Sequence, residues 1–357
     1  MFKTLVIRIN QGYNSKKSGK EESILQHQDN SCFDRLIELQ DIKFKKNNGA
    51  ITYLGKTIDL SQYHGVIFSY NEDIVYLRSE QPIYQKLFKM RKFFSKQYPK
   101  IKIYNDPENY KIYASKIDFY QRVKDDIRIK KCVKIPDFWV IKNIQDLTDI
   151  IKDNDDIFPC FISYNIQSGG KNKIVCNSFD ELKKSYHDLI IHEDYKQNNQ
   201  QIFVSKVITS YHSALNSNLT VRWMVINDQL IDFYARPAPV DVINVNYYNQ
   251  YKGDQLKHAH TYVETWLTKN RYTFHRFLRG MNYLMGSGFY SYDTVISEEG
   301  EIYIVEPGLK FLASNHLKLK DMRSATYDLL IFDQKKYLNA MIQIINQDLS
   351  HHQQSNF

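Results

Sequence analysis

Several residue types are scarce in this chain of 357 residues, and each scarcity excludes a class of protein. Glycine (13) and proline (8) are too few for a collagen-like or linker-dominated chain. The four cysteines, Cys32, Cys132, Cys160 and Cys176, are scattered and form no CxxC pair. Four such cysteines are typical of buried thiols in a reducing compartment, so we expect a cytoplasmic protein.

Long hydrophobic runs are also missing. No stretch approaches the roughly 18 uninterrupted apolar residues of a transmembrane helix. The apolar run in the first residues, MFKTLVIRINQGYN, is too short for a signal-peptide core, and no small-residue cleavage site follows it. We therefore expect no membrane partner.

The composition that remains is that of a globular protein. The chain is 43% hydrophobic, 14% aromatic and 25% charged, which excludes a mostly disordered chain. At roughly 100–200 residues per domain, the length predicts two or three domains. The net charge of +8 favours anionic partners such as nucleotides, nucleic acid or lipid headgroups, and does not choose among them.

Hydrophobic spacing predicts an α/β unit in the first 110 residues. Strands are expected at 4–9, 64–69 and 102–104, a hairpin around Gly55, and a helix whose apolar positions run from Ile83 to Phe94. The other face of that helix is rich in lysine. A basic surface from Lys86 to Lys102 is either a nucleic-acid face or an ordinary solvated helix face, and the second interpretation is favoured.

Further strands and helices alternate along the rest of the chain. Strands are predicted after Pro136 and at 159–164, 173–176, 201–208, 220–226, 230–235, 290–296 and 301–305. Helices are predicted at 114–123, 147–151 and 179–189, with one long helix at 263–284 and a closing helix at 326–347. The proposed domains are 1–110, 111–205 and 206–350, followed by a frayed tail at 351–357.

Three features could carry chemistry. The first is Ser168-Gly169-Gly170-Lys171, between two expected strands. Its glycines can bring backbone N–H groups against an anion, and its lysine suits phosphate, although Gly-Gly is also ordinary turn chemistry.

The second and third features are pairs of charged residues. Asp293 and Glu306 lie on two strands of an expected hairpin, where facing carboxylates can hold Mg²⁺, although strand-end carboxylates are usually solvated. Arg222 and Arg236 lie on consecutive strands. Each needs a partner, either a structural carboxylate or a bound phosphate or carboxylate.

The order of these features resembles the ATP-grasp superfamily, in particular its carboxylate–amine ligase branch, over about residues 104–308. That branch includes ribosomal-protein glutamate ligases, glutathione synthetases and the ligases that macrocyclise microviridin-type peptides. The similar segments are NDPENYKIYASKIDFYQRV, KIPDFWVI, FPCFISYNIQSGGKNKIV, VRWMVINDQLIDFYARPA and SYDTVISEEGEIYIVEPG. The first 110 residues resemble the α/β domain that precedes the ATP-grasp fold.

The resemblance implies a role for each candidate residue. Lys116 and Lys171 would neutralise nucleotide phosphates, and the loop Ser168-Gly169-Gly170 would close over the γ-phosphate. Arg222 and Arg236 would stabilise developing charge or hold the substrate carboxylate. Asp293 and Glu306 would hold Mg²⁺, with ATP as co-substrate.

Three positions depart from the family's pattern. Ser163 stands where a second phosphate-binding lysine is usual, and Lys171 or Lys173 could substitute for it. Lys206 stands near a usual acidic hinge residue, and Gly308 replaces the asparagine of the family's Glu-x-Asn metal motif.

The sequence therefore leads to three hypotheses. The first is an ATP-dependent carboxylate–amine ligase acting on a small molecule or peptide through an acyl phosphate. The alternative is a degenerate ATP-grasp protein that binds nucleotide or a partner without ligation. A nucleic-acid-binding protein ranks last, since the basic helix lacks interleaved exposed aromatics. His258 and His260 are interpreted as surface histidines, and the identity of the substrates and the oligomeric state stay open.

Overall fold

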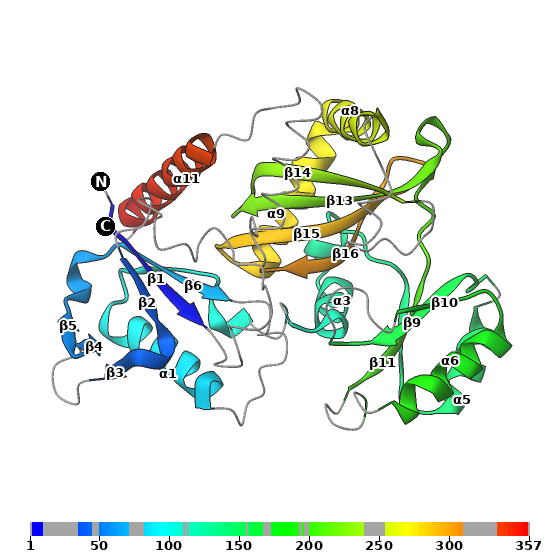
Figure 1. The fold of residues 1–357 in the computed structure, drawn as a ribbon, viewed down its shortest axis with the longest axis horizontal. Helices are drawn as coiled ribbons and strands as arrows, with labels where there is room; N and C mark the ends of the chain where they lie inside the picture. Colours follow the sequence, from blue (N-terminus) through cyan, green and yellow to red (C-terminus); the bar gives the residue numbers. More distant parts are fainter. Residues whose placement is uncertain are drawn as a thin grey trace.

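The computed structural model describes residues 2–9, 35–44, 50–70, 82–109, 112, 114–154, 156–166, 173–192, 195, 200–238, 254–309 and 334–355. Four β-sheets and the helices that cover them make up this part of the chain, in a mixed α/β architecture (Figure 1). The short 3-10 helices of this part of the chain are η2 (Leu39–Asp41), η3 (Leu60–Gln62), η5 (Pro107–Asn109) and η6 (Ser213–Leu215).

The N-terminal sheet is parallel, which is typical of the α/β unit predicted for the first 110 residues. Its strand order is β2-β1-β6-β7, formed by β1 (Thr4–Ile9), β2 (Arg35–Glu38), β6 (Gly65–Tyr70) and β7 (Lys102–Tyr104). Helix α1 (Pro82–Gln97) connects β6 to β7 and buries the apolar stripe Leu87, Met90 and Phe94. The expected hairpin is present within a small antiparallel sheet of β3 (Ile42–Phe44), β4 (Ile51–Tyr53) and β5 (Lys56–Ile58).

A second sheet is antiparallel and has the order β10-β9-β11-β8. Its strands are β8 (Phe138–Ile141), β9 (Cys160–Tyr164), β10 (Ile174–Cys176) and β11 (Ile202–Lys206). Helices α5 (Ile144–Asp153) and α6 (Phe179–Ile191) pack on one face through a separate apolar cluster. Helix α5 starts earlier than predicted because Asn143 and Asp146 form a capping box at its N-terminus.

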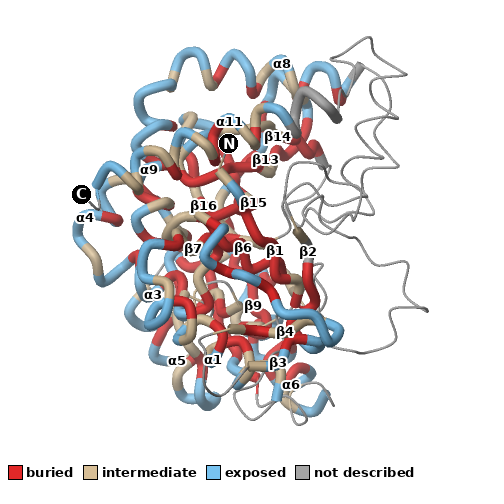
Figure 2. Tube along the Cα trace, turned by 90° about the vertical axis from the view of Figure 1, so that its left-hand side faces the viewer, coloured by how far each residue is buried: buried red, intermediate tan, exposed pale blue. Residues whose placement is uncertain are grey.

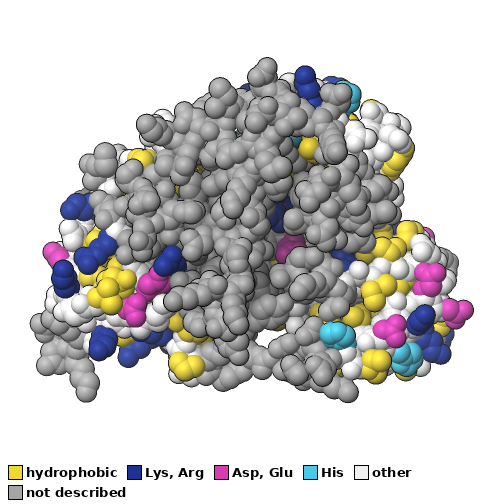
Figure 3. All heavy atoms as spheres, viewed as in Figure 1, with side chains coloured by type: hydrophobic (Ala, Val, Ile, Leu, Met, Phe, Trp, Pro, Cys, Tyr) yellow, Lys and Arg dark blue, Asp and Glu magenta, His cyan; other side chains and the backbone are white. Residues whose placement is uncertain are grey.

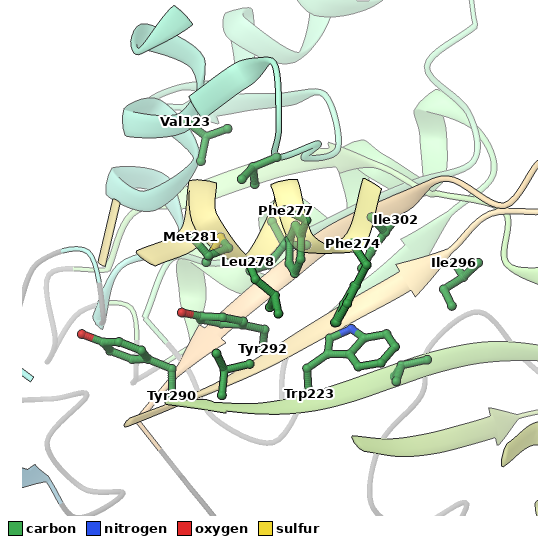
Figure 4. Close-up of a cluster of buried hydrophobic side chains, with 14 of the residues drawn as sticks. Val123, Trp223, Phe274, Phe277, Leu278, Met281, Tyr290, Tyr292, Ile296 and Ile302 are labelled. Atoms are coloured by element: carbon green, nitrogen blue, oxygen red, sulfur yellow. The ribbon is translucent and has the colours of Figure 1, made fainter. Parts of the chain in front are cut away.

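The third sheet is the largest and carries the main hydrophobic core. It joins β12 (Tyr211–His212), β13 (Ser217–Ile226), β14 (Gln229–Ala238), β15 (Phe289–Ile296) and β16 (Ile302–Gly308). One face is covered by α8 (Asp254–Lys269) and α9 (Arg271–Met285), with α3 (Lys116–Asp125) and α4 (Ile127–Lys130) beside α9. Figure 4 shows Phe274 and Phe277 of α9 directed at Trp223 and Tyr292 of the sheet.

The single long helix predicted at 263–284 is wrong, because the chain forms α8 and α9 separated at Asn270. The backbone of Asn270 leaves helical geometry (φ −111°, ψ 22°). Its backbone N–H and its side-chain amide both donate to the Trp266 carbonyl, at 2.8 and 3.0 Å. By donating twice to a carbonyl in the last turn of α8, Asn270 ends that helix. The apolar spacing in the sequence nevertheless continues from α8 into α9.

The C-terminal helix α11 (Gln334–Gln354) joins the N-terminal sheet to the largest sheet (Figure 1). Its Asp348 accepts hydrogen bonds from Lys102 Nζ (2.6 Å) and Tyr104 Oη (2.7 Å). The tail predicted to be frayed from residue 351 is therefore helical as far as Gln354. Among the described residues, no helix combines the length and apolar character that crossing a membrane requires.

Candidate nucleotide-binding site

Two arginines and one aspartate meet on the face of the largest sheet that α9 does not cover. Arg222 on β13 lies directly opposite Asp293 on β15 and donates two hydrogen bonds to it, Nε to Oδ1 at 2.6 Å and Nη2 to Oδ2 at 2.7 Å. Arg236 on β14 lies opposite Thr220. Because Thr220 is two residues before Arg222 on β13, Arg236 and Arg222 lie on the same face of the sheet. The Arg236 Nη2 also donates a hydrogen bond to Asp293 Oδ1. The two arginines thus share one carboxylate.

Asp293 is ionised in this arrangement. Burial by itself raises the pKa of Asp293, but the charges and hydrogen bonds of Arg222 and Arg236 outweigh burial and hold that pKa well below its usual value. Two guanidinium groups facing one carboxylate leave a net positive charge. The buried Arg236 Nε and Thr220 Oγ1 have no hydrogen-bond partner among the described residues, so the cluster retains donor capacity.

Glu306 lies beside this cluster and faces a lysine. It is opposite Asp293 in the β15–β16 pairing, next to a bulge between Asp293 and Thr294. Lys116 Nζ is 3.0 Å from Glu306 Oε2. Lys116 is the first residue of α3, whose N-terminus is capped by the Ser115 side chain. Helix α3 therefore brings a cation to the carboxylate that β16 supplies.

A buried asparagine fixes the start of α3 to the second sheet. Asn165, just after β9, accepts hydrogen bonds from the Ile117 backbone N–H (2.8 Å) and from Ser115 Oγ (3.2 Å). Its amide nitrogen lies 2.9 Å from Ser115 Oγ and 3.2 Å from Gln201 Oε1. No sequence signal points to this role, because an asparagine after a strand is common in turns.

Lys173, which precedes β10, is the cation that the second sheet contributes. The register pairs Ile174 with Ile162, so Lys173 is the next position along and is opposite Ser163. Its Nζ lies 3.7 Å from the centre of the Phe161 ring. Burial, and then the neighbouring charge of Lys116, lower the pKa of Lys173 to about 7, against the opposing effect of Glu306. Side chains from both sheets thus share one electrostatic environment.

Comparisons with known proteins identify the architecture. No family profile and no curated protein sequence matches the chain. Among solved structures, the ATP-grasp ligase PsnB with a phosphomimetic precursor variant, Mg and ADP superposes with a TM-score of 0.52 at 10% identity, covering 97% of this chain and 98% of that chain. D-alanyl-alanine synthetase A from Vibrio cholerae gives a TM-score of 0.50 at 10% identity, covering 98% and 100%.

A third structure agrees with these two. PsnB complexed with the precursor peptide PsnA2 and AMPPNP has a TM-score of 0.50 at 12% identity, and 97% of each chain is covered. The chain has the ATP-grasp fold. The α/β class and the N-terminal α/β domain expected from the sequence are confirmed by coverage that extends over nearly the whole chain.

Within this ATP-grasp fold, most of the predicted site residues converge. Arg222, Arg236 and Asp293 form one cluster, and Lys116 and Glu306 form an ion pair beside it. The predicted loop Ser168-Gly169-Gly170-Lys171 lies outside the described residues.

The three departures from the family pattern have different surroundings. Ser163 is buried in β9 on the strand next to β10. Lys206 ends β11 and forms an ion pair with Asp156 at 2.5 Å. Gly308 ends β16 opposite Ser291. Because glycine has no side chain, this position supplies no oxygen ligand for a metal beside Glu306.

The donor set is compatible with Mg²⁺, which proteins commonly bind through one or two carboxylates plus substrate phosphates and water. Asp293 and Glu306 lie on paired strands and supply two such carboxylates. No group of three or more His, Cys, Asp or Glu side chains suited to a metal occurs in the described part of the chain. His258 is exposed on α8, as expected of a surface histidine, whereas His260 is half-buried with its ring centre 5.1 Å from that of Phe233.

The basic face of α1 is partly occupied by contacts within the chain. Lys86 Nζ donates to the Gln40 carbonyl at 2.7 Å, and Lys89 Nζ lies 4.8 Å from the Phe44 ring centre. Arg91 forms ion pairs with two carboxylates of the segment after β7. Figure 3 shows basic and acidic side chains intermixed on this side of the molecule. These contacts favour the solvated-helix interpretation over a nucleic-acid face.

Proposed function

We propose that this protein is an ATP-dependent carboxylate–amine ligase. The observation that carries the proposal is the convergence of four cationic side chains and two carboxylates from three parts of the fold. Lys116 comes from α3 and Lys173 from the second sheet, while the largest sheet contributes Arg222, Arg236, Asp293 and Glu306.

The charge balance supports a polyanionic ligand such as the triphosphate of ATP. The four cations exceed the two carboxylates in charge, and the second sheet places Lys173 within the electrostatic range of Lys116. Buried or half-buried excess positive charge is unfavourable unless an anion binds there. Lys116 and Lys173 would neutralise nucleotide phosphates, with Lys173 compensating for Ser163.

The chemistry that follows is phosphoryl transfer and then amide formation. A substrate carboxylate oxygen attacks the γ-phosphorus of ATP, and the bond to the β,γ-bridging oxygen breaks to release ADP. An amine then attacks the acyl phosphate carbon, phosphate leaves, and the amine loses a proton. Arg222 and Arg236 would orient the carboxylate and offset the charge that develops on the transferred group.

A magnesium ion would be held by Asp293 and Glu306. When bound, it would draw charge from the β- and γ-phosphates of ATP. Asp293 would then share its oxygens between the ion and the two arginines.

A second function, nucleotide binding without ligation, is supported by two specific observations. Gly308 provides no third side-chain ligand near Glu306. Both carboxylates already have cationic partners within the chain.

An assay of ADP release separates the two functions. The full chain is incubated with Mg-ATP and a panel of amino acids and short peptides, and hydroxylamine is added to trap acyl phosphates as hydroxamates. We expect ADP release that depends on one carboxylate substrate, with the product mass showing loss of water between the partners. Glu306→Gln should lower this rate by at least about tenfold, because it removes one of the two carboxylates that would hold the Mg²⁺ that offsets phosphate charge.

The matched control is Glu299→Gln, which alters an exposed glutamate in the turn of the same hairpin and should leave the rate unchanged. ATP binding in a thermal-shift assay without ADP release from any pair would favour the non-ligating function. The absence of ATP binding would refute both.

A further inference from the structure

The outer surface of α9 has an unusual composition for this chain. Residues 271–285 read RYTFHRFLRGMNYLM, with three arginines and no lysine, aspartate or glutamate. The whole chain contains 36 lysines and only 12 arginines. A solvated helix face would therefore be expected to carry mainly lysine, mixed with acidic residues. This helix instead presents arginine and tyrosine.

The inner face of α9 already accounts for its role in folding. Phe274, Phe277, Leu278 and Met281 are buried and point toward the largest sheet (Figure 4). The residues on the other side of the helix are exposed, including both tyrosines: Tyr272 is 77% and Tyr283 55% exposed. Two large, solvent-exposed aromatic rings on one helix are not explained by packing.

Helix α4 extends this surface. The Arg128 guanidinium lies 4.4 Å from the Tyr283 ring centre, and Arg276 lies 5.9 Å from the Tyr272 ring centre. Arg276 Nη2 also donates to the Lys131 carbonyl at 3.2 Å, which links α9 to the end of α4. Ile127 is 68% exposed on α4. Figure 2 shows α4 and α9 on the same side of the largest sheet.

We name this surface the arginine–tyrosine face; it consists of Ile127, Arg128, Arg271, Tyr272, Arg276, Arg279 and Tyr283. Stacking on a tyrosine ring restricts a guanidinium group before any partner arrives, which lowers the entropic cost of binding. Arg271, Arg276 and Arg279 form no ion pair within the described residues, and Arg128 pairs with Asp126. The face is therefore strongly positive, with donors still available to a partner.

We propose that the arginine–tyrosine face docks an acidic polypeptide segment. Protein–protein interfaces are enriched in tyrosine and arginine and depleted in lysine, which matches α9. Nucleic-acid surfaces use lysine and arginine alike on phosphates, so they do not account for the absence of lysine from this helix. Carboxylates of the segment would accept paired hydrogen bonds from the arginines, and an apolar residue would cover Ile127.

This docking is independent of the proposed ligase activity. Helix α9 packs against the face of the sheet that carries Trp223 and Tyr292, whereas Arg222 and Asp293 lie on the other face. A partner on α9 would therefore leave the candidate nucleotide site accessible.

Fluorescence anisotropy with two labelled probes tests the proposal on the full chain. The first probe is a twelve-residue peptide of four Glu-Glu-Leu repeats, and the second is a single-stranded oligothymidylate of twelve nucleotides. Both are titrated at about 0.15 M salt, where distant surface charges are screened. We expect the peptide to bind with a Kd below about 1 mM and more tightly than the oligonucleotide.

Matched variants locate the binding. Arg276→Glu combined with Arg279→Glu should weaken peptide binding at least about tenfold, as loss of interface arginines does elsewhere. Lys183→Glu combined with Lys184→Glu makes the same charge change on the exposed surface of α6 and should alter binding less than about twofold. Arg276→Lys with Arg279→Lys should give an intermediate loss, because charge is retained without the planar fork. Circular dichroism confirms that each variant is folded.

Three outcomes would overturn the proposal. The first is the absence of peptide binding at about 1 mM. The second is equal weakening by both charge reversals, which would mean that only net charge attracts the peptide. The third is tighter binding of the oligonucleotide that depends on the same arginines, which would make this a nucleic-acid surface.

Discussion

Replacement of Asp293 by asparagine tests whether the two arginines of the candidate site depend on one carboxylate. The side chain of Asp293 bonds both Arg222 and Arg236 and is the only ion-pair partner shown for Arg236 in the described structure. Asparagine has almost the same volume and keeps one oxygen, so the change removes charge and leaves the packing nearly unaltered. Two guanidinium groups would then face each other with no anion between them.

The expected cost follows from how little solvent reaches these groups. The side chains of Arg222 and Asp293 are each 17% exposed, and that of Arg236 is 8% exposed, so water screens the pair weakly. Removing one partner of a buried ion pair costs about 3–5 kcal/mol. Because the pKa of Asp293 is held below 3.8, its stabilising effect is present above that pH and is lost as the pH falls through the folded-state pKa.

Urea unfolding followed by tryptophan fluorescence measures this cost, since Trp223 is buried next to Arg222 on β13. The matched control is Asp156→Asn, which removes an ion pair with Lys206 in which the Asp156 side chain is 85% exposed. That change should leave the free energy of unfolding nearly unaltered, because water and salt screen an exposed ion pair. Added sulfate, which binds without a metal ion, should stabilise Asp293→Asn more than the wild type, because the variant has one more uncompensated positive charge. An unfolding free energy for Asp293→Asn within about 1 kcal/mol of the wild type would refute the reasoning.

Two further predictions concern the approach to this cluster. ATP affinity should fall as the pH rises through about 7, because phosphate favours the protonated form of Lys173 and binding then takes up a proton. Isothermal titration calorimetry should show that the affinity of Lys173→Arg, which stays charged, depends less on pH. An equal pH dependence of ATP affinity in the wild type and the variant would contradict the assignment. Asn165→Ala should weaken ATP binding and speed hydrogen exchange at the Ile117 amide, which loses its 2.8 Å acceptor; unchanged exchange at that amide would show that Asn165 does not hold the start of α3.

The hairpin of β15 and β16 shows what sequence reasoning can predict. Its turn is short, and the Ser297 N–H donates to the Glu301 carbonyl at 2.8 Å, which fixes the register of the two strands. Regular alternation from this turn would place Asp293 opposite Val305, but the bulge between Asp293 and Thr294 shifts the register so that Asp293 lies opposite Glu306. The local turn therefore predicts the hairpin, whereas the bulge that brings the two carboxylates together has no signal in the sequence.

The partner of the two arginines could not be predicted in the same way. Arg222 and Asp293 are 71 residues apart, and β14, α8 and α9 lie between their strands in the sequence. Which strand pairs with β13 on its second edge depends on packing of the helices, not on a local pattern. The sequence therefore left the partner open between a carboxylate and a bound anion.

Lys173 was ambiguous for a different reason. Sequence order placed both Lys171 and Lys173 near the missing lysine at Ser163, but only the register of β9 and β10 places Lys173 opposite it. The break at Asn270 was equally hidden, because the apolar stripe continues from α8 into α9. The deciding features are the backbone pairing of β9 with β10 in the first case and the hydrogen bond of Asn270 to the Trp266 carbonyl in the second, and composition reveals neither.

The positive excess of the site is the physical link between its structure and its proposed function. With Lys173 protonated, the four cations exceed Asp293 and Glu306 by two charges, and deprotonation of Lys173 reduces the excess to one. The arginine pair alone could neutralise the charge of a singly charged ligand. Such a ligand would leave the repulsion between Lys116 and Lys173 uncompensated. A triphosphate is long enough and charged enough to reach cations from both sheets at once. The placement of Lys116 on helix α3 and of Lys173 beside the second sheet is therefore better explained by a nucleotide than by a simple carboxylate ligand.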